Sequence, residues 1–388
     1  MKFVPLPFRS PLEQYQKQAE ELQDDHRRGE PEAIAFFHEK HPRFLDDTIK
    51  WLPKRLNDDE IRDAQLNIDD ARLAVARAYN FRDWQALAEY VAAVAQDGPV
   101  FWFESAVEAV INGDLAALQA LLREHPELVT SRSTRITNFD PPAHRATLLH
   151  YIGANGVEDY RQKTTPAAVD IARALLKAGA EVDALADMDG GHATTMSGLV
   201  SSTPPFEAGL QDALIDVLAG YGAALDATSQ WGPPALTALV FGFPSAARAL
   251  IKRGARVDNV AIAAGLGMRD ETDRLLAHAD VKSRHAALAL AAQYGHADVV
   301  QLLLDAGEDP SRYNPPGMHT HGTPLHSAAF GGHSSAVQRL VERGARCDMI
   351  DTVWQGTPLD WAIYGKQKDI ETYLRSRGAK TAAELASA

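Results

Sequence analysis

The chain is poor in cysteine and in long apolar runs. Its 388 residues include a single cysteine, Cys347, which excludes a secreted scaffold held together by internal disulfides. The longest apolar stretches, residues 235–243 and 286–292, are far shorter than the roughly 18 residues of a membrane helix. Pro5 and Pro7 interrupt the apolar core that a signal peptide needs. We therefore expect a cytoplasmic protein that does not enter a membrane.

Positive charge is also scarce. The chain has 39 Lys and Arg against 52 Asp and Glu, which gives a net charge of −13 at neutral pH. This composition lacks the basic footprint of a general nucleic-acid binder or of a protein that binds anionic membranes. A protein partner is therefore expected, with a small molecule as the alternative, and no nucleic acid.

Familiar catalytic motifs are absent as well. The sequence has no Gly-x-Ser-x-Gly elbow, no phosphate-binding Gly-x-x-x-x-Gly-Lys loop and no His-Glu-x-x-His helix. The pair Gly265 and Gly267 does not follow a strand and does not indicate a dinucleotide site. Cys347 is expected to fill space rather than to act as a nucleophile. The balance is against an enzyme, and no cofactor is predicted.

The N-terminal region, residues 1–98, is predicted to be a separate helical domain. Proline and capping residues predict helices over residues 10–28, 31–41, 44–51 and 57–79. Asp97, Gly98 and Pro99 mark the boundary. We expect a second domain over residues 99–380 and a flexible tail over residues 381–388.

A repeat organises the second domain. Glycines that end helices recur at 43, 32, 53, 37 and 34 residues, at Gly179, Gly222, Gly254, Gly307, Gly344 and Gly378. A second signature precedes each helix pair. It is complete as Thr323-Pro324-Leu325-His326 and returns, varied, as Thr357-Pro358-Leu359-Asp360 and Thr147-Leu148-Leu149-His150.

These motifs resemble the ankyrin repeat in helix pair, turn and period. The resemblance implies an all-α solenoid of about eight repeats, each burying its apolar face on the next, with β-turn fingers beside a concave binding face. It also implies that His150 and His326 hydrogen-bond turn backbone, with Asp360 in that role in the last repeat. The segment from Ala76 through Phe81 and Trp84 to Leu87 resembles the helical leader of a group of bacterial ankyrin-repeat proteins. Its Phe81 and Trp84 are expected to anchor the leader on the first repeat, with a recognition site as the alternative.

Nearly every finger carries an imidazole or an indole close to the start of its helix pair. Taken singly, these are ordinary exposed residues. As a row they are expected to line one groove with aromatic surface of the kind found at binding hot spots. The expected function is recognition of a protein partner through the residues His144, His192, Trp231, His319, His321 and Trp354.

The rival hypothesis places a pocket beside two insertions, residues 156–165 and 201–209, because lengthened loops often carry function. In it the chain is an enzyme or small-molecule binder in which His144, His192, Asp187 and Asp189 act as acid, base or metal ligands.

A second group, His319, His321 and Asp351, has metal-capable side chains but no fixed third ligand. Some five repeats separate the two groups, so they cannot form one site. The sequence favours the binder over the enzyme, and no metal is predicted.

Overall fold

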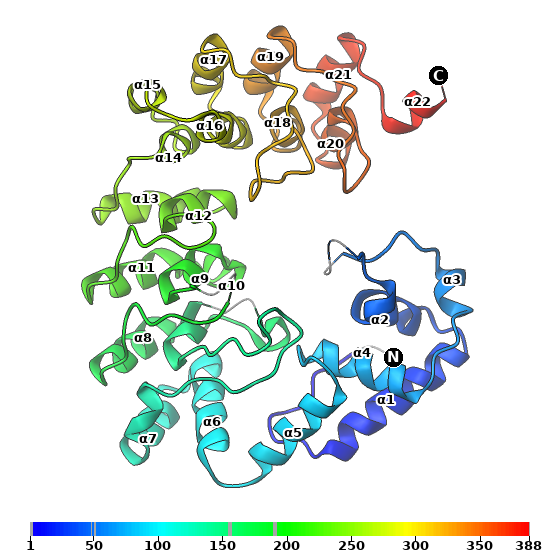
Figure 1. The fold of residues 1–388 in the computed structure, drawn as a ribbon, viewed down its shortest axis with the longest axis vertical. Coiled ribbons are helices and arrows are strands. Elements are labelled where there is room, and N and C mark those ends of the chain that lie inside the picture. The colour runs from blue at the N-terminus through cyan, green and yellow to red at the C-terminus, as the bar shows by residue number, and fades with distance from the viewer. Residues whose placement is uncertain (1–2, 48, 50–51, 154–156, 189–191, 388) are drawn as a thin grey trace. The chain divides into compact units, whose positions relative to one another are not determined.

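The computed structural model describes residues 3–47, 49, 52–153, 157–188 and 192–387 of the chain (Figure 1). Helices make up its regular structure, and the described residues contain isolated β-bridges but no longer strand. The prediction of an all-α protein is confirmed. The chain divides into two compact units, which we call the first unit (Met1–Ala224) and the second unit (Leu225–Ala388). The predicted boundary near residue 98 lies inside the first unit.

The first unit contains the N-terminal helices and the first repeats. Its α-helices are α1 (Leu12–Arg27), α2 (Pro31–Lys40), α3 (Asp58–Arg62), α4 (Ile68–Ala78), α5 (Trp84–Ala95), α6 (Pro99–Asn112), α7 (Leu115–Glu124), α8 (Ala168–Lys177), α9 (Thr195–Ser201), α10 (Thr203–Glu207) and α11 (Gln211–Gly220). Short 3₁₀ turns are η1 (Pro42–Phe44), η2 (Pro126–Val129), η3 (Leu148–Gly153) and η4 (Asp159–Arg161).

Two of the predicted leader helices differ in the structure. The helix predicted over residues 57–79 is divided into α3 and α4, because Asn67 forms a second capping box with Asp70. Asn57 and Glu60 form the predicted capping box at the start of α3, with hydrogen bonds of 2.9 and 3.0 Å. The helix predicted over residues 44–51 is absent from its described part, where Phe44 ends η1 and Leu45 pairs with Pro53. Its remaining positions, 48, 50 and 51, lie outside the described residues.

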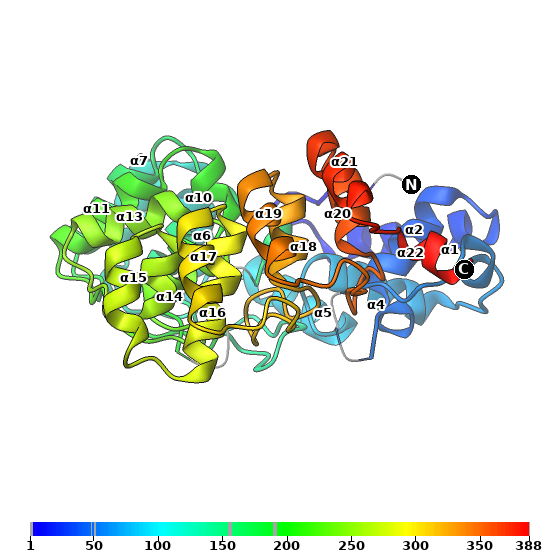
Figure 2. The same cartoon turned by 90° about the horizontal axis from the view of Figure 1, so that it is seen from above.

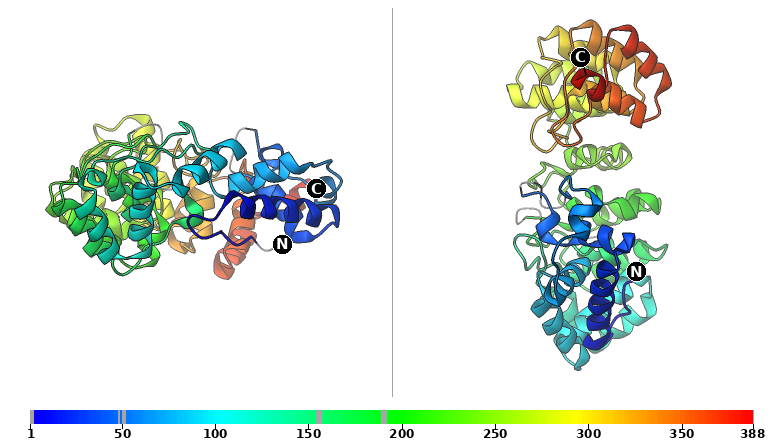
Figure 3. Two further views of the ribbon diagram at one scale, coloured as in Figure 1. Left: turned by 90° about the horizontal axis from the view of Figure 1, so that it is seen from below. Right: turned by 90° about the vertical axis from the view of Figure 1, so that its right-hand side faces the viewer.

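The leader packs around α1, which lies along α4 and also contacts α2 (Figures 1 and 3). Its core includes Tyr79, whose hydroxyl accepts from the backbone N–H of Leu6 at 2.8 Å and donates to Gln18 at 2.9 Å. Asn80 takes the predicted left-handed conformation, with φ of 59°. It turns the chain so that Phe81 is buried and pairs through its backbone with Thr137 of the first finger. Phe81 thus contacts the first finger, as the anchoring prediction expects, whereas Trp84 packs partly buried against the N-terminal core.

The second unit is a stack of helix pairs. Its helices are α12 (Pro234–Val240), α13 (Pro244–Lys252), α14 (Val260–Gly265), α15 (Arg269–Leu276), α16 (Val281–Gln293), α17 (Ala297–Asp305), α18 (Pro324–Phe330), α19 (Ser334–Glu342), α20 (Pro358–Tyr364), α21 (Lys368–Ser376) and α22 (Ala382–Ala386). The inner helices α14, α16, α18 and α20 pack on one another in order, and the outer helices α15, α17, α19 and α21 form the second row (Figure 1).

The fingers of this stack are uneven. Short links join α13 to α14 and α15 to α16. Long loops precede α18 and α20 and project from the same edge of the stack (Figure 2). The two loops are joined where the Thr352 N–H donates to the His321 carbonyl at 2.9 Å.

The repeat histidines have the predicted structural role. In α18, His326 Nδ1 accepts from the Thr323 N–H at 3.1 Å, and Nε2 bonds the Gly356 carbonyl of the next finger at 3.2 Å. His150 does the same with Thr147 and with the Ala193 carbonyl. Each ring therefore closes its own helix start and joins it to the neighbouring repeat.

The last segment, predicted to be a flexible tail, contains the helix α22. Thr381 and Glu384 form a capping box at its start, in the way that Thr357 and Asp360 do for α20. The Ala382 N–H donates to Asp360 at 2.8 Å. The segment thus begins like one more inner helix of the stack, without a finger before it.

Candidate functional site

A buried charged cluster lies where the leader meets the first repeats. It consists of Glu104 on α6, Arg135 and His144 from the first finger, and Glu158 and Arg161 from the first insertion. Each of these side chains is at most 7% exposed. Two carboxylates and two guanidinium groups balance in charge, which a buried ionic cluster requires.

Glu158 is the centre of this cluster. Its Oε2 accepts a hydrogen bond from Arg161 Nε at 2.6 Å. Its Oε1 accepts hydrogen bonds from Tyr151 Oη and from His144 Nε2, each at 2.8 Å. The guanidinium of Arg161 also donates to the carboxylate of Glu104 at 3.0 Å. Burial alone would raise the pKa of Glu158, but Arg161 and Arg135 hold that pKa well below its usual value. Glu158 is therefore ionised at neutral pH.

Arg135 joins the cluster to the leader. Its guanidinium donates to the Tyr79 carbonyl at 3.0 Å and lies over the rings of Phe81 and Tyr90, at 4.2 and 4.6 Å from their centroids. Tyr90 in turn donates to Glu104 at 3.1 Å. The first insertion, beside which the rival hypothesis places its pocket, contributes Glu158, which pairs with Arg135, and Arg161, which pairs with Glu104. It thereby helps to fix the leader on the repeats.

His144 is not part of an exposed groove. Its ring is 1% exposed, and Nδ1 accepts from the Ala146 N–H at 3.1 Å. Because Nδ1 accepts, the proton lies on Nε2, where it is donated to Glu158. The prediction of His144 as a finger-tip binding residue is corrected, because both ring nitrogens are used inside the protein.

The three described residues of the rival hypothesis differ in their surroundings, although the Asp187 N–H donates to the His144 carbonyl at 2.7 Å. His144 is buried, whereas His192 is exposed. Asp187 is half-buried and lies 4.0 Å from Arg145. Asp189 lies outside the described residues. Within the described ranges, no group of three or more His, Cys, Asp and Glu is arranged to hold a metal ion.

Asp351, the weak metal candidate, forms hydrogen bonds within its own finger. Its carboxylate accepts from the backbone N–H of Gly356 at 2.7 Å and of Val353 at 3.0 Å. It also accepts from Trp361 Nε1 at 3.0 Å. Asp351 therefore shapes the finger and fixes the orientation of an indole, so its grouping with His319 and His321 as metal ligands is not supported.

Trp231 packs inside the second unit. Its ring lies edge-on to Phe241 and rests against Gly317 in the long finger that precedes α18. Its indole N–H is buried and has no hydrogen-bond partner in the part of the chain that the structure describes. Trp231 thus packs against the long finger that precedes α18. Trp354 is 58% exposed, as the binding hypothesis expects.

Five rings form a continuous line on the last two complete repeats, which we call the aromatic track. His319 and His321 begin it in the finger, with their ring centroids 5.7 Å apart. His321 then lies 5.5 Å from Trp361, which lies 6.1 Å from Phe330, which in turn stacks on Tyr364 at 6.2 Å. The track thus runs from a finger to the ends of α18 and α20.

The outer end of the aromatic track is open. Phe330 is 48% exposed and Tyr364 is 82% exposed. These two residues occupy the same position of successive repeats, seven residues after Thr323 and Thr357. Sequence reasoning missed Phe330, Trp361 and Tyr364, although aligning the repeats on that threonine would have shown an aromatic pair.

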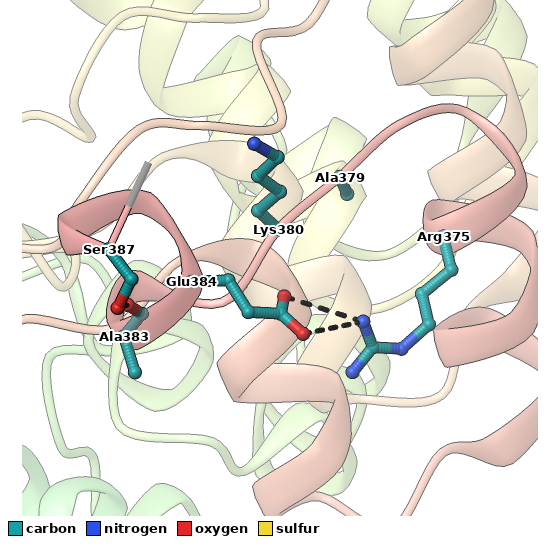
Figure 4. Close-up of a pocket in the computed structure, with 6 residues that line it drawn as sticks. All are labelled: Arg375, Ala379, Lys380, Ala383, Glu384 and Ser387. Atoms are coloured by element: carbon teal, nitrogen blue, oxygen red, sulfur yellow. Dashed lines mark hydrogen bonds and ion pairs between the residues drawn. The ribbon is translucent and has the colours of Figure 1, made fainter.

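A shallow pocket of about 580 Å³ lies beside α22 (Figure 4). Arg375 and Glu384 form an ion pair across it, at 3.2 and 3.4 Å, and the amine of Lys380 points away from that pair. The pocket is open, and its lining is the end of the stack: Arg375, Ala379, Lys380, Ala383, Glu384 and Ser387. It gathers no group of catalytic character.

The comparisons identify ankyrin repeats in the C-terminal region. The family described as ankyrin repeats, in three copies, matches residues 288–384. Ankyrin repeat and SAM domain-containing protein 6 of Mus musculus is 36% identical over 104 residues, which are 26% of this chain and 11% of that protein. The protein of the same name from Danio rerio is 42% identical over 88 residues, 23% of this chain and 11% of its own length.

The predicted ankyrin fold is thereby confirmed, and the matched region contains the aromatic track and ends within α22. The chain spans about a tenth of the length of these relatives. In the described part of the chain, no helix has both the length and the apolar character to cross a membrane. The bacterial affinity of the leader and the cytoplasmic location stay predictions.

Proposed function

We propose that this chain is a protein-binding module and that its second unit holds a partner segment on the aromatic track. The observation that carries the proposal is the line of five rings in mutual contact, open to solvent at Phe330 and Tyr364. Exposed aromatic rings in contact offer a large, rigid contact area at low entropic cost.

Three features of the aromatic track support binding over packing. Trp361 is held in place by Asp351, so its ring is oriented before a partner arrives. His321 is half-buried and burial lowers its pKa, which keeps the imidazole neutral near pH 7. Trp354 and His319 are exposed on the adjoining fingers. Trp354 extends the proposed surface beyond the track, of which His319 is the first ring.

Replacing both Phe330 and Tyr364 with alanine is expected to weaken partner binding about thirtyfold or more, since hot-spot residues contribute about 2 kcal/mol. The full-length chain serves as bait, and retained proteins are quantified by mass spectrometry. Because Tyr364 is 82% and Phe330 48% exposed, the thermal unfolding midpoint should fall only slightly.

A matched control replaces another exposed phenylalanine and tyrosine, Phe139 and Tyr221 of the first unit, which are 45% and 42% exposed. Proteins retained by the parent chain and this control, but lost from the Phe330 and Tyr364 variant, would support the proposal. Equal recovery by all three chains would refute it.

A further inference from the structure

The open end of the aromatic track is bordered by lysines. Lys366 lies two residues after Tyr364, and Lys368 begins α21. Both side chains are exposed, and neither forms an ion pair within the described ranges. Asp369 follows on the same turn, so the segment keeps a net positive charge.

The carboxylates of Asp351 and Asp360, which lie near the aromatic track, form hydrogen bonds within the repeats. Asp360 accepts from the N–H and hydroxyl of Thr357, at 2.8 and 2.9 Å, and from the Ala382 N–H. Asp351 accepts from three backbone N–H groups and from Trp361. These hydrogen bonds occupy the oxygens of both carboxylates without removing their charge. Among the described residues, Lys366, Lys368 and Asp369 are the exposed charges without an ion pair next to Tyr364, two positive against one negative.

Lys366 also has an unfavourable backbone conformation, with φ of 58°. Glycine occupies the equivalent position of earlier repeats, as Gly295 and Gly332. A Cβ atom there would come within 2.5 Å of His333 and 2.7 Å of Gln367 from the following repeat. Lys366 is exposed, so within the described residues no such neighbour occupies the space of its side chain. Glycine would adopt the positive φ of position 366 without strain. Lysine at this position therefore costs some stability, and it places a charge beside Tyr364.

We infer that the aromatic track takes an acidic peptide segment of a partner protein. An apolar or aromatic side chain of that segment packs on Phe330 and Tyr364, and neighbouring carboxylates pair with Lys366 and Lys368. This inference rests on the proposed function and adds the chemistry of the partner. The local charge favours an acidic segment, because Lys366 and Lys368 outnumber Asp369 next to Tyr364. The second unit holds as many acidic as basic residues, so it carries no net negative charge that would repel such a segment, and the net charge of −13 belongs to the first unit.

The test is selection of random peptides on the immobilised full-length chain at low salt. Selected peptides are expected to combine an aromatic or large aliphatic residue with Asp or Glu. A variant with Lys366→Gly and Lys368→Gln should bind them about tenfold more weakly. High salt should remove most of the difference. The single variant Lys366→Gly should unfold at the same temperature as the parent chain or higher, so that weaker binding cannot be assigned to misfolding.

The outcomes separate this inference from the proposed function. Peptides that require Phe330 and Tyr364 but show no excess of Asp and Glu, or that bind the lysine variant equally, would overturn the acidic-segment inference alone. If no selected peptide requires the two rings, both proposals fail. A second copy of this chain as occupant would appear as a dimer that the Phe330 and Tyr364 variant no longer forms, and this would also overturn the inference.

Discussion

Replacing Glu158 with alanine is expected to lower the free energy of unfolding of the first unit by roughly 3–5 kcal/mol, the usual loss when one partner of a buried ionic group is removed. The substitution leaves the guanidinium groups of Arg161 and Arg135 buried without their carboxylate. It also removes the acceptor of His144 and Tyr151, each of which then bears a desolvation cost.

The measurement is urea unfolding of the full-length chain, with hydrogen exchange of α6 and α8 assigning the transition to the first unit. Asp170→Ala is the matched control, because the pair of Asp170 with Arg173 is 65% and 51% exposed and should contribute under about 0.5 kcal/mol. If Glu158→Ala lost no more stability than this control, the buried cluster would not hold the leader on the repeats.

The sequence predicts the repeat fold better than it predicts this cluster. Helix starts follow from local chemistry, as for Thr323 with His326, since both partners lie within one turn. Glu104, Arg135 and Glu158 come from three separate segments, and nothing local relates them. A charged residue is normally exposed, so an insertion rich in charge is interpreted as a surface loop. Only the three-dimensional structure shows that Glu158 and Arg161 of this insertion are buried.

The sequence predicts three residues of the proposed binding surface. His319, His321 and Trp354 precede the repeat motif, where fingers lie. His144 and Trp231 precede it as well, yet the structure buries one against Glu158 and packs the other against Gly317. Position in the repeat therefore predicts the finger but not the direction of the side chain. That direction depends on the neighbouring insertion and on the long finger, which differ from the repeat pattern.

Acidification is expected to destabilise both units through the repeat histidines. Burial lowers the pKa of His150 and of His326 from 6.5 to about 4, while hydrogen bonds to backbone carbonyls act in the opposite sense. The unfolded chain therefore takes up protons first. The contribution of each neutral ring is complete above pH 6.5 and is lost progressively as the pH falls toward 4. At about pH 5 the loss amounts to roughly 2 kcal/mol for each histidine.

The variant His326→Asn isolates one of these contributions, because an amide can accept from Thr323 and donate toward Gly356 without titrating. Unfolding of the second unit is followed by hydrogen exchange at about pH 7.5 and about pH 5, with rates corrected for intrinsic exchange. At the higher pH the variant is expected to be somewhat less stable than the parent chain, because asparagine fills the site less well. On acidification it should lose roughly 2 kcal/mol less, while the first unit, which keeps His150, responds as in the parent chain. Equal losses in the second unit of both chains would mean that His326 is not held neutral by its burial between α18 and the next finger.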